Sequence, residues 1–177
     1  GGRLSPQELE LPGDWSGAAP FLCAAAVTGR SIELEGLDAG DPQGDRRILE
    51  ILAGAGCSFG WKGRTLAFEG RLERGLEADL AECPYLAPVL VATAALAPGE
   101  SRLTGLGTLP FKECDRLEAS AELVHWLGGR AQILEGPALR IRPGPAPGAR
   151  PPFDPRGDHR MAFAAAVGGL LRGGELR

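Results

Sequence analysis

Lysine is almost absent from this chain of 177 residues, in which Lys62 and Lys112 are the only two and 17 arginines supply the rest of the positive charge. The 19 basic residues are spread along the chain instead of forming a basic block, and the formal net charge is −4. Nucleic-acid-binding domains concentrate positive charge on one face or stripe, so nucleic acid is a poor candidate for a partner. Lys112 stands out against this arginine-rich background.

Paired metal ligands are also missing. The four cysteines are 34, 26 and 31 residues apart, no Cys-x-x-Cys pair occurs, and the chain has two histidines. This spacing argues against a metal site. Because no secretory segment is recognisable at the N-terminus, the cysteines are expected to be reduced thiols of a cytoplasmic protein.

Long hydrophobic runs are absent. The two longest uncharged stretches, Trp15 to Gly29 and Cys83 to Gly99, fall short of the roughly 20 residues that a membrane span needs. Since 44% of the residues are hydrophobic, the chain can still bury a core, and a soluble protein is expected. The first residue is Gly1 and not Met, so the chain is expected to be a piece of something longer.

Two segments of the chain repeat each other at an offset of 68 or 69 residues. Ala18 to Leu22 is echoed by Leu86 to Leu90, and Glu35-Gly36-Leu37 by Thr104-Gly105-Leu106. The repeat indicates a structural unit of roughly 70 residues that is used more than once.

Each copy is expected to contain a helix, a strand, a second helix and two strands, which places the chain in the α/β or α+β class. In the first copy these elements are expected at 14–29, 31–37, 44–53, 57–61 and 65–69. In the second copy they are expected at 86–97, 101–106, 112–127, 130–134 and 138–142. A proline-rich loop at 143–155 then leads to a helix at about 160–171, the start of a third copy.

The stretch Lys112-Glu113-Cys114-Asp115-Arg116 is the most informative cluster of charges. On the expected helix, Lys112 and Arg116 stand at i and i+4, where like charges weaken an isolated helix by a few tenths of a kcal/mol. An anion is therefore expected to compensate. Glu113 lies within reach of Arg116, so the cluster combines two cations with a proton donor or acceptor, a combination suited to a small phosphate or carboxylate.

Four motifs in this order resemble the later part of the 5-enolpyruvylshikimate-3-phosphate synthase family. They are Gly13-Asp14-Trp15-Ser16, Gln43-Gly44-Asp45, Lys112-Glu113-x-Asp115-Arg116 and Asp158-His159-Arg160-Met161. The resemblance implies repeated βαβαββ units in two domains. It further implies a transferase of the shikimate pathway of aromatic amino acid biosynthesis, which moves the enolpyruvyl group of phosphoenolpyruvate to the 5-hydroxyl of shikimate 3-phosphate and releases phosphate.

The resemblance also implies roles for individual residues. Arg116 and Arg160 would hold phosphoenolpyruvate, Lys112 would lie between the two substrates, and Glu113 would serve proton transfer. His159 would hydrogen-bond the transferred group, and Ser16 would contact the shikimate phosphate. No metal or organic cofactor is expected.

Some positions depart from the family pattern. Tyr85 stands where the family has an Asp that is a candidate base, and a tyrosine with the ordinary pKa near 10 is a poor base at neutral pH. Gly17 replaces the second Ser of a pair, Thr108 an Asn and Pro110 an Arg. The cations of the family's first domain and its final Lys lie outside Gly1 to Arg177, so the chain alone is expected to be inactive.

Residues 1–60 are expected to end the first domain and 61–177 to form most of the second, truncated before its last strand and helix. The rest of the parent chain would be needed to complete the cleft. Two alternatives stay open: a non-catalytic, degenerate anion-binding module of the same fold, and the related enolpyruvyl transferase acting on UDP-N-acetylglucosamine. Lys112-Glu113-x-Asp115-Arg116 followed by Asp158-His159-Arg160 favours the shikimate enzyme.

Overall fold

The computed structural model describes residues 11–177, which form helices and two β-sheets. The α-helices are α1 (Trp15–Thr28), α2 (Ile48–Gly54), α3 (Ala87–Leu96), α4 (Arg116–Trp126) and α5 (His159–Arg172). The strands are β1 (Ser31–Glu35), β2 (Ser58–Lys62), β3 (Thr65–Glu69), β4 (Glu77–Asp79), β5 (Ser101–Thr104), β6 (Arg130–Leu134) and β7 (Ala138–Arg142). Short 3-10 helices are η1 (Gly44–Arg47), η2 (Pro84–Leu86) and η3 (Leu109–Phe111).

The predicted repeat is confirmed in space. The elements α1, β1, α2, β2 and β3 follow one another in the same order as α3, β5, α4, β6 and β7. The first sheet has the order β1-β3-β2, which matches β5-β7-β6 in the second sheet. Strand β4 adds to β5 in parallel, whereas the other strand pairs are antiparallel. The stretch from β4 to β7 is therefore one complete βαβαββ unit.

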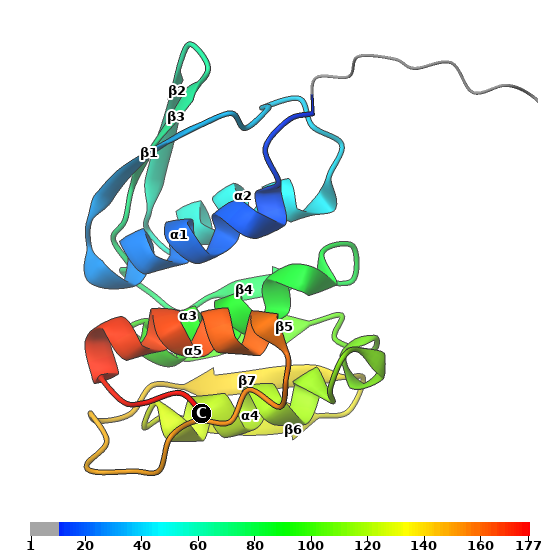
Figure 1. Ribbon diagram of the computed structural model, residues 1–177, viewed down its shortest axis with the longest axis vertical. Helices are drawn as coiled ribbons and strands as arrows, with labels where there is room; N and C mark the ends of the chain where they lie inside the picture. Colours follow the sequence, from blue (N-terminus) through cyan, green and yellow to red (C-terminus); the bar gives the residue numbers. More distant parts are fainter. Residues whose placement is uncertain (1–10) are drawn as a thin grey trace, which may run out of the picture.

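Three helices, α1, α3 and α5, pack side by side across the middle of the molecule (Figure 1). Helices α1 and α3 are equivalent members of the two repeats, and α5 is the expected first helix of a third. The sheet of β1, β2 and β3 lies on one side of this layer, and the sheet of β4 to β7 lies on the other with α4 (Figure 1).

Helix α3 is the centre of the core. Every residue from Ala87 to Ala95 is buried, and the hydroxyl of Thr93 donates to the carbonyl oxygen of Val89 at 2.9 Å. A helix that is apolar on all sides is stable only when it is covered on all sides. The two uncharged runs of the sequence are thus core helices, α1 and α3. No helix within residues 11–177 has the length and apolarity to cross a membrane.

The helix predicted from Lys112 begins four residues later. Lys112 is extended, with φ −94° and ψ −162°, and Asp115 is the N-cap of α4. The Asp115 carboxylate accepts from the amides of Leu117 and Glu118 at 3.0 and 3.1 Å, which fixes the helix start. The prediction that Lys112 and Arg116 share a helix face at i and i+4 is therefore wrong.

Other differences are small. The helix expected at 44–53 is divided into η1 and α2, and β4, a strand of three residues, was not predicted because its pairing is with a distant segment. The division expected between residues 1–60 and 61–177 stays a prediction; residue 60 lies within β2, and one hydrophobic cluster includes residues from both parts.

A substitution at Gly70, the residue after β3, can test how closely the chain packs against α1 at this point. A Cβ at this position would overlap the backbone of Ala25 in the last turn of α1. We expect Gly70→Ala to lower the free energy of unfolding by about 2 kcal/mol or more in denaturant titration, because neither backbone can move freely. Gly60→Ala in β2, where nothing lies within 4 Å, should change it by less than about 1 kcal/mol. Equal effects of the two variants would contradict this packing.

Candidate active site

The N-termini of α1, α4 and α5 are each capped by an aspartate: Asp14, Asp115 and Asp158. Each carboxylate accepts from two backbone amides of the first turn of its helix. The N–H groups that a helix start offers to anions are thus already partly engaged. An anion at these helix starts must be recognised mainly by cationic side chains.

A buried ion cluster links the two charged motifs. The side chain of Arg116 is fully buried, and its Nε and Nη2 donate to Asp158 Oδ2 and Oδ1 at 2.7 and 3.2 Å. Nη2 also donates to Glu113 Oε2 at 2.6 Å. Nη1 has no hydrogen-bond partner among the described residues. Because Asp158 caps α5 and Arg116 opens α4, this ion pair joins the starts of both helices.

The charge of Arg116 is reflected in the pKa of Asp158. Burial opposes ionisation of this carboxyl, but its hydrogen bonds to Arg116, the charge of Arg116 and the amides of Arg160 and Met161 outweigh burial. The pKa of Asp158 is therefore below its usual value. The neighbouring Cys114 thiol has a raised pKa, because burial and the Asp158 carboxylate disfavour the thiolate. Cys114 is thus poorly suited to act as a nucleophile.

Two further cations meet at one aromatic ring. Lys112 Nζ lies 4.8 Å and Arg160 Cζ 4.5 Å from the centre of the Tyr85 ring. Arg160 also donates through Nη2 to Ser16 Oγ at 3.1 Å, and Ser16 Oγ lies 3.1 Å from Asp14 Oδ2. These contacts bring α1, η2, α5 and the loop before α4 together.

A cavity of about 210 Å³ opens at this meeting point. Ser16, Tyr85, His159 and Arg160 contribute polar groups to its wall, together with Asp14. The rest of the lining is mostly apolar: Gly17, Pro20, Phe21, Pro88, Val89 and Phe163. Four of the seven site residues expected from the sequence therefore line one cavity of a size suited to a small anion.

The other three expected residues lie beside this cavity. Lys112 reaches Tyr85, whereas Glu113 and Arg116 belong to the ion cluster with Asp158. Arg116 is fully buried, so it adds nothing to the exposed wall of the cavity. The structure thus brings all seven residues to one region of the molecule.

Two residues of the Gln43-Gly44-Asp45 motif were not among the expected site residues. Gln43 accepts from the amide of Trp15 at 2.8 Å and donates to Asp14 Oδ1 at 2.7 Å. Asp45 is buried, and burial raises the pKa of its carboxyl, although the charge of Arg160 acts in the opposite direction. The polar side chains of this motif, which the sequence offered only as part of the family resemblance, were the available signal for these contacts.

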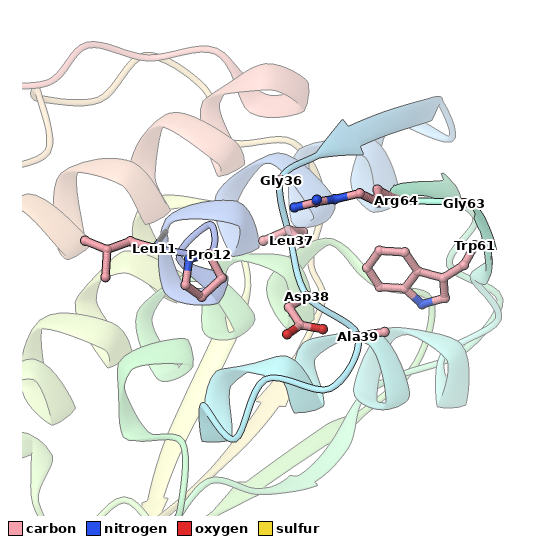
Figure 2. A pocket seen from close by; sticks show the side chains of 9 residues that line it. All are labelled: Leu11, Pro12, Gly36, Leu37, Asp38, Ala39, Trp61, Gly63 and Arg64. Atoms are coloured by element: carbon pink, nitrogen blue, oxygen red, sulfur yellow. The ribbon is translucent and has the colours of Figure 1, made fainter. Parts of the chain in front are cut away.

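A larger cavity of about 720 Å³ lies elsewhere. Figure 2 shows its lining, which comes from the chain before α1, the loop after β1 and the turn between β2 and β3. Trp61 in its wall packs edge-on against Trp15, with ring centres 6.3 Å apart. None of the seven expected site residues lines this cavity, so the smaller one is the candidate active site.

The βαβαββ unit and the cations gathered at helix starts are features of an enolpyruvyl transferase. An enolpyruvyl transferase from Streptomyces tendae shares the fold, with a TM-score of 0.50 and 19% identity over 89% of this chain and 37% of that one. The EPSP synthase from Acinetobacter baumannii is more similar, with a TM-score of 0.74 and 26% identity over 98% of this chain and 42% of that one.

The family model of EPSP synthase (3-phosphoshikimate 1-carboxyvinyltransferase) matches residues 1–177, and the chain belongs to this family. The 3-phosphoshikimate 1-carboxyvinyltransferase of Aeropyrum pernix is 44% identical over 173 residues, which are 96% of this chain and 39% of that protein. That of Methanospirillum hungatei is 35% identical over 174 residues, 97% of this chain and 40% of that protein. The chain thus spans about two fifths of the length of these relatives.

Replacement of Asp158 should lower the stability of the fold much more than replacement of another aspartate cap. We expect Asp158→Ala to lower the free energy of unfolding by about 3 kcal/mol or more, because it leaves the buried charge of Arg116 with one partner. Asp115→Ala removes a cap without this ion pair and should cost about 1 kcal/mol. Denaturant titration of both variants measures the difference, and equal losses would show that the ion pair contributes nothing beyond capping.

Asp158 and Asp45 should respond to pH in opposite directions. The stability contributed by the low pKa of Asp158 is present above the ordinary Asp pKa and is lost as pH falls through the folded-state pKa. The raised pKa of Asp45 makes its ionisation costly as pH rises. We therefore expect Asp158→Asn to flatten the acid side of the stability profile and Asp45→Asn to reduce the loss of stability between pH 4 and pH 7. Thermal unfolding across this range checks both, and parallel profiles for wild type and variants would refute the assignment.

Proposed function

We propose that this chain supplies the phosphoenolpyruvate side of the active site of a 3-phosphoshikimate 1-carboxyvinyltransferase. The reaction transfers the enolpyruvyl group to the 5-hydroxyl of shikimate 3-phosphate, with release of phosphate, in the shikimate pathway of aromatic amino acid biosynthesis. One observation supports this proposal above the others. Lys112 and Arg160 both contact the Tyr85 ring, beside the ion cluster of Arg116 and at the rim of a cavity suited to a small anion.

The proposed chemistry is an addition followed by an elimination. The 5-hydroxyl gives up its proton to a base as its oxygen adds to C2 of phosphoenolpyruvate, and C3 takes up a proton from an acid, which gives a tetrahedral intermediate. Loss of the C3 proton then expels phosphate from C2. Fixed cations favour this course because they neutralise the phosphate and carboxylate of the substrate and the charge of the leaving group.

Six of the seven expected residues, all but Tyr85, have a part in this proposal. Lys112 and Arg160 hold the phosphate and carboxylate of phosphoenolpyruvate. Arg116, expected from the sequence to hold the same substrate, is fully buried, so its part is to add positive charge beside the cavity and to hold Glu113 and Asp158 in place. Glu113 lies 52% exposed at the edge of the ion cluster and serves proton transfer.

The remaining two residues face the cavity directly. His159 hydrogen-bonds the transferred group, and Ser16, which already holds Arg160, contacts the shikimate phosphate.

The complete cleft is proposed to need further segments of a longer protein, because the chain spans about two fifths of its relatives. Residues 1–60 would then belong to the end of the first domain and 61–177 to the second. A cytoplasmic location and activity without a cofactor complete the proposal.

A non-catalytic anion-binding module is the second candidate. Tyr85, in place of the family's carboxylate, is the observation that favours it, because the ring provides cation contacts but no carboxylate that could serve as the base. The alternative of transfer to UDP-N-acetylglucosamine is less well supported, because the matching family is EPSP synthase.

The enzyme hypothesis is tested by phosphate release from phosphoenolpyruvate and shikimate 3-phosphate, measured with the complete coding product that contains this chain. We expect Glu113→Gln to lower kcat about 100-fold, because a positioned acid or base contributes at least that much. We expect Lys112→Met to lower kcat/KM to a similar extent, through the loss of a cation beside the leaving phosphate.

Matched controls separate chemistry from folding. Glu118→Gln in the exposed first turn of α4 and Lys62→Met on β2, whose side chain is 74% exposed, should leave both parameters within about twofold. Wild-type turnover excludes the non-catalytic module. Absence of turnover in the wild type and in Tyr85→Asp, with retained binding of phosphoenolpyruvate, would instead support it.

A further inference from the structure

Tyr85 contacts both cations at the cavity. It follows Pro84 at the start of η2, its side chain is 45% exposed, and its ring lies within 5 Å of Lys112 Nζ and Arg160 Cζ. A cation near an aromatic ring is attracted by the negative face of the π system, most strongly when water is partly excluded. The ring therefore stabilises both side chains in place.

The ring holds the two cations without neutralising them. Within residues 11–177, neither Lys112 nor Arg160 forms an ion pair with a carboxylate, in contrast to Arg116. The direct side-chain contacts of Arg160 are with the Tyr85 ring and the Ser16 hydroxyl, which are both uncharged, whereas the buried Asp45 carboxyl acts on Arg160 through its charge alone. The N–H donors of both cations thus remain free of carboxylate ion pairs and available to an incoming anion.

A carboxylate at position 85 would act differently. It would attract the same two cations, but it would cancel one of their charges and compete with an anionic ligand for their N–H donors. A tyrosine keeps the cluster one charge more positive than an aspartate would, at the same place in the fold.

We propose that Tyr85 is a positioning residue that holds Lys112 and Arg160 as a pair of cations without an ion-pair partner, and so adapts the cavity to bind the phosphate or carboxylate of a small anion. Its positioning role follows from the geometry alone. Only the identification of that anion as phosphoenolpyruvate rests on the proposed function.

Three substitutions at this position separate the ring from the charge. Isothermal titration of the protein with phosphoenolpyruvate, and separately with inorganic phosphate, measures the affinity. Tyr85→Phe keeps the π face and should bind within about twofold of wild type. Tyr85→Leu removes it and should bind about tenfold more weakly, which corresponds to about 1.4 kcal/mol. Tyr85→Asp adds a competing charge and should bind more weakly still.

A second measurement reports the contact itself. In a spectrum of the 177-residue chain with 13C-labelled lysine, ring currents of Tyr85 should displace the side-chain signals of Lys112 to high field, and Tyr85→Phe should keep this displacement. Tyr85→Leu should abolish it. The other lysine, Lys62, is 74% exposed on β2 and serves as the internal reference. Phe111→Leu, which removes an aromatic ring that is 86% exposed, is the matched control and should change neither signal nor affinity.

The outcomes distinguish this inference from the proposed function. An undisplaced Lys112 signal in the wild type, or equal affinities for Tyr85→Leu and wild type, overturns the role of Tyr85 whether or not the protein is an enzyme. In the complete coding product, Tyr85→Leu should raise KM for phosphoenolpyruvate about tenfold with kcat changed by less than threefold. No turnover in the wild type, together with the expected affinities and signals, rejects the enzyme while the positioning role stands.

Discussion

The buried pair of Arg116 and Asp158 determines how the charged motifs are placed. Both side chains are fully shielded from water, and a guanidinium that stays protonated requires a carboxylate in this environment. The pair fixes the start of α4, in the second unit, against the start of α5, which opens the third. Lys112 and Glu113 precede one end of this link and His159 and Arg160 follow the other, so their relative positions depend on it.

The three aspartate caps show how charge is divided in this region. Asp14, Asp115 and Asp158 satisfy backbone amides, and Asp158 also neutralises Arg116. Lys112 and Arg160 are instead held by an aromatic ring and a hydroxyl. One group of charges is therefore engaged in capping and in the buried ion pair, whereas the other forms no ion pair among the described residues. The two groups differ in their partners, which residue types alone do not reveal.

Much of the fold was predictable because its signals are local. Uncharged runs, an alternation of polar and apolar residues and glycines at element ends located α1, α3, β3, β6 and β7, and the offset of about 70 residues revealed the repeat. The start of α4 was predicted too early, because Lys112 and Glu113 are good helix formers and the competing Asp115 cap was placed inside the helix. Strand β4 is defined by a partner more than 20 residues away, which no local pattern encodes.

The site was predictable to a similar degree. Motifs named six of the seven residues, and Tyr85 was noted as a departure from the family pattern. Spacing did not distinguish the buried Arg116 from the half-buried Lys112, since burial depends on α5 packing against α4. The contact of Tyr85 with two cations joins three segments that lie far apart in the chain. The sequence shows that Tyr85 departs from the family pattern. Only the structure shows which groups the substituted side chain contacts.

The shared helix layer also has a consequence for how the chain folds. Helix α3 has no face suited to water, and its surroundings include α1 from the preceding repeat and α5 from the following one. The repeats can therefore be recognised in the sequence, but a single repeat is not expected to fold independently of its neighbours. Loss of either neighbouring helix would expose the apolar surface of α3 to water, so the three helices should fold and unfold as one cooperative unit.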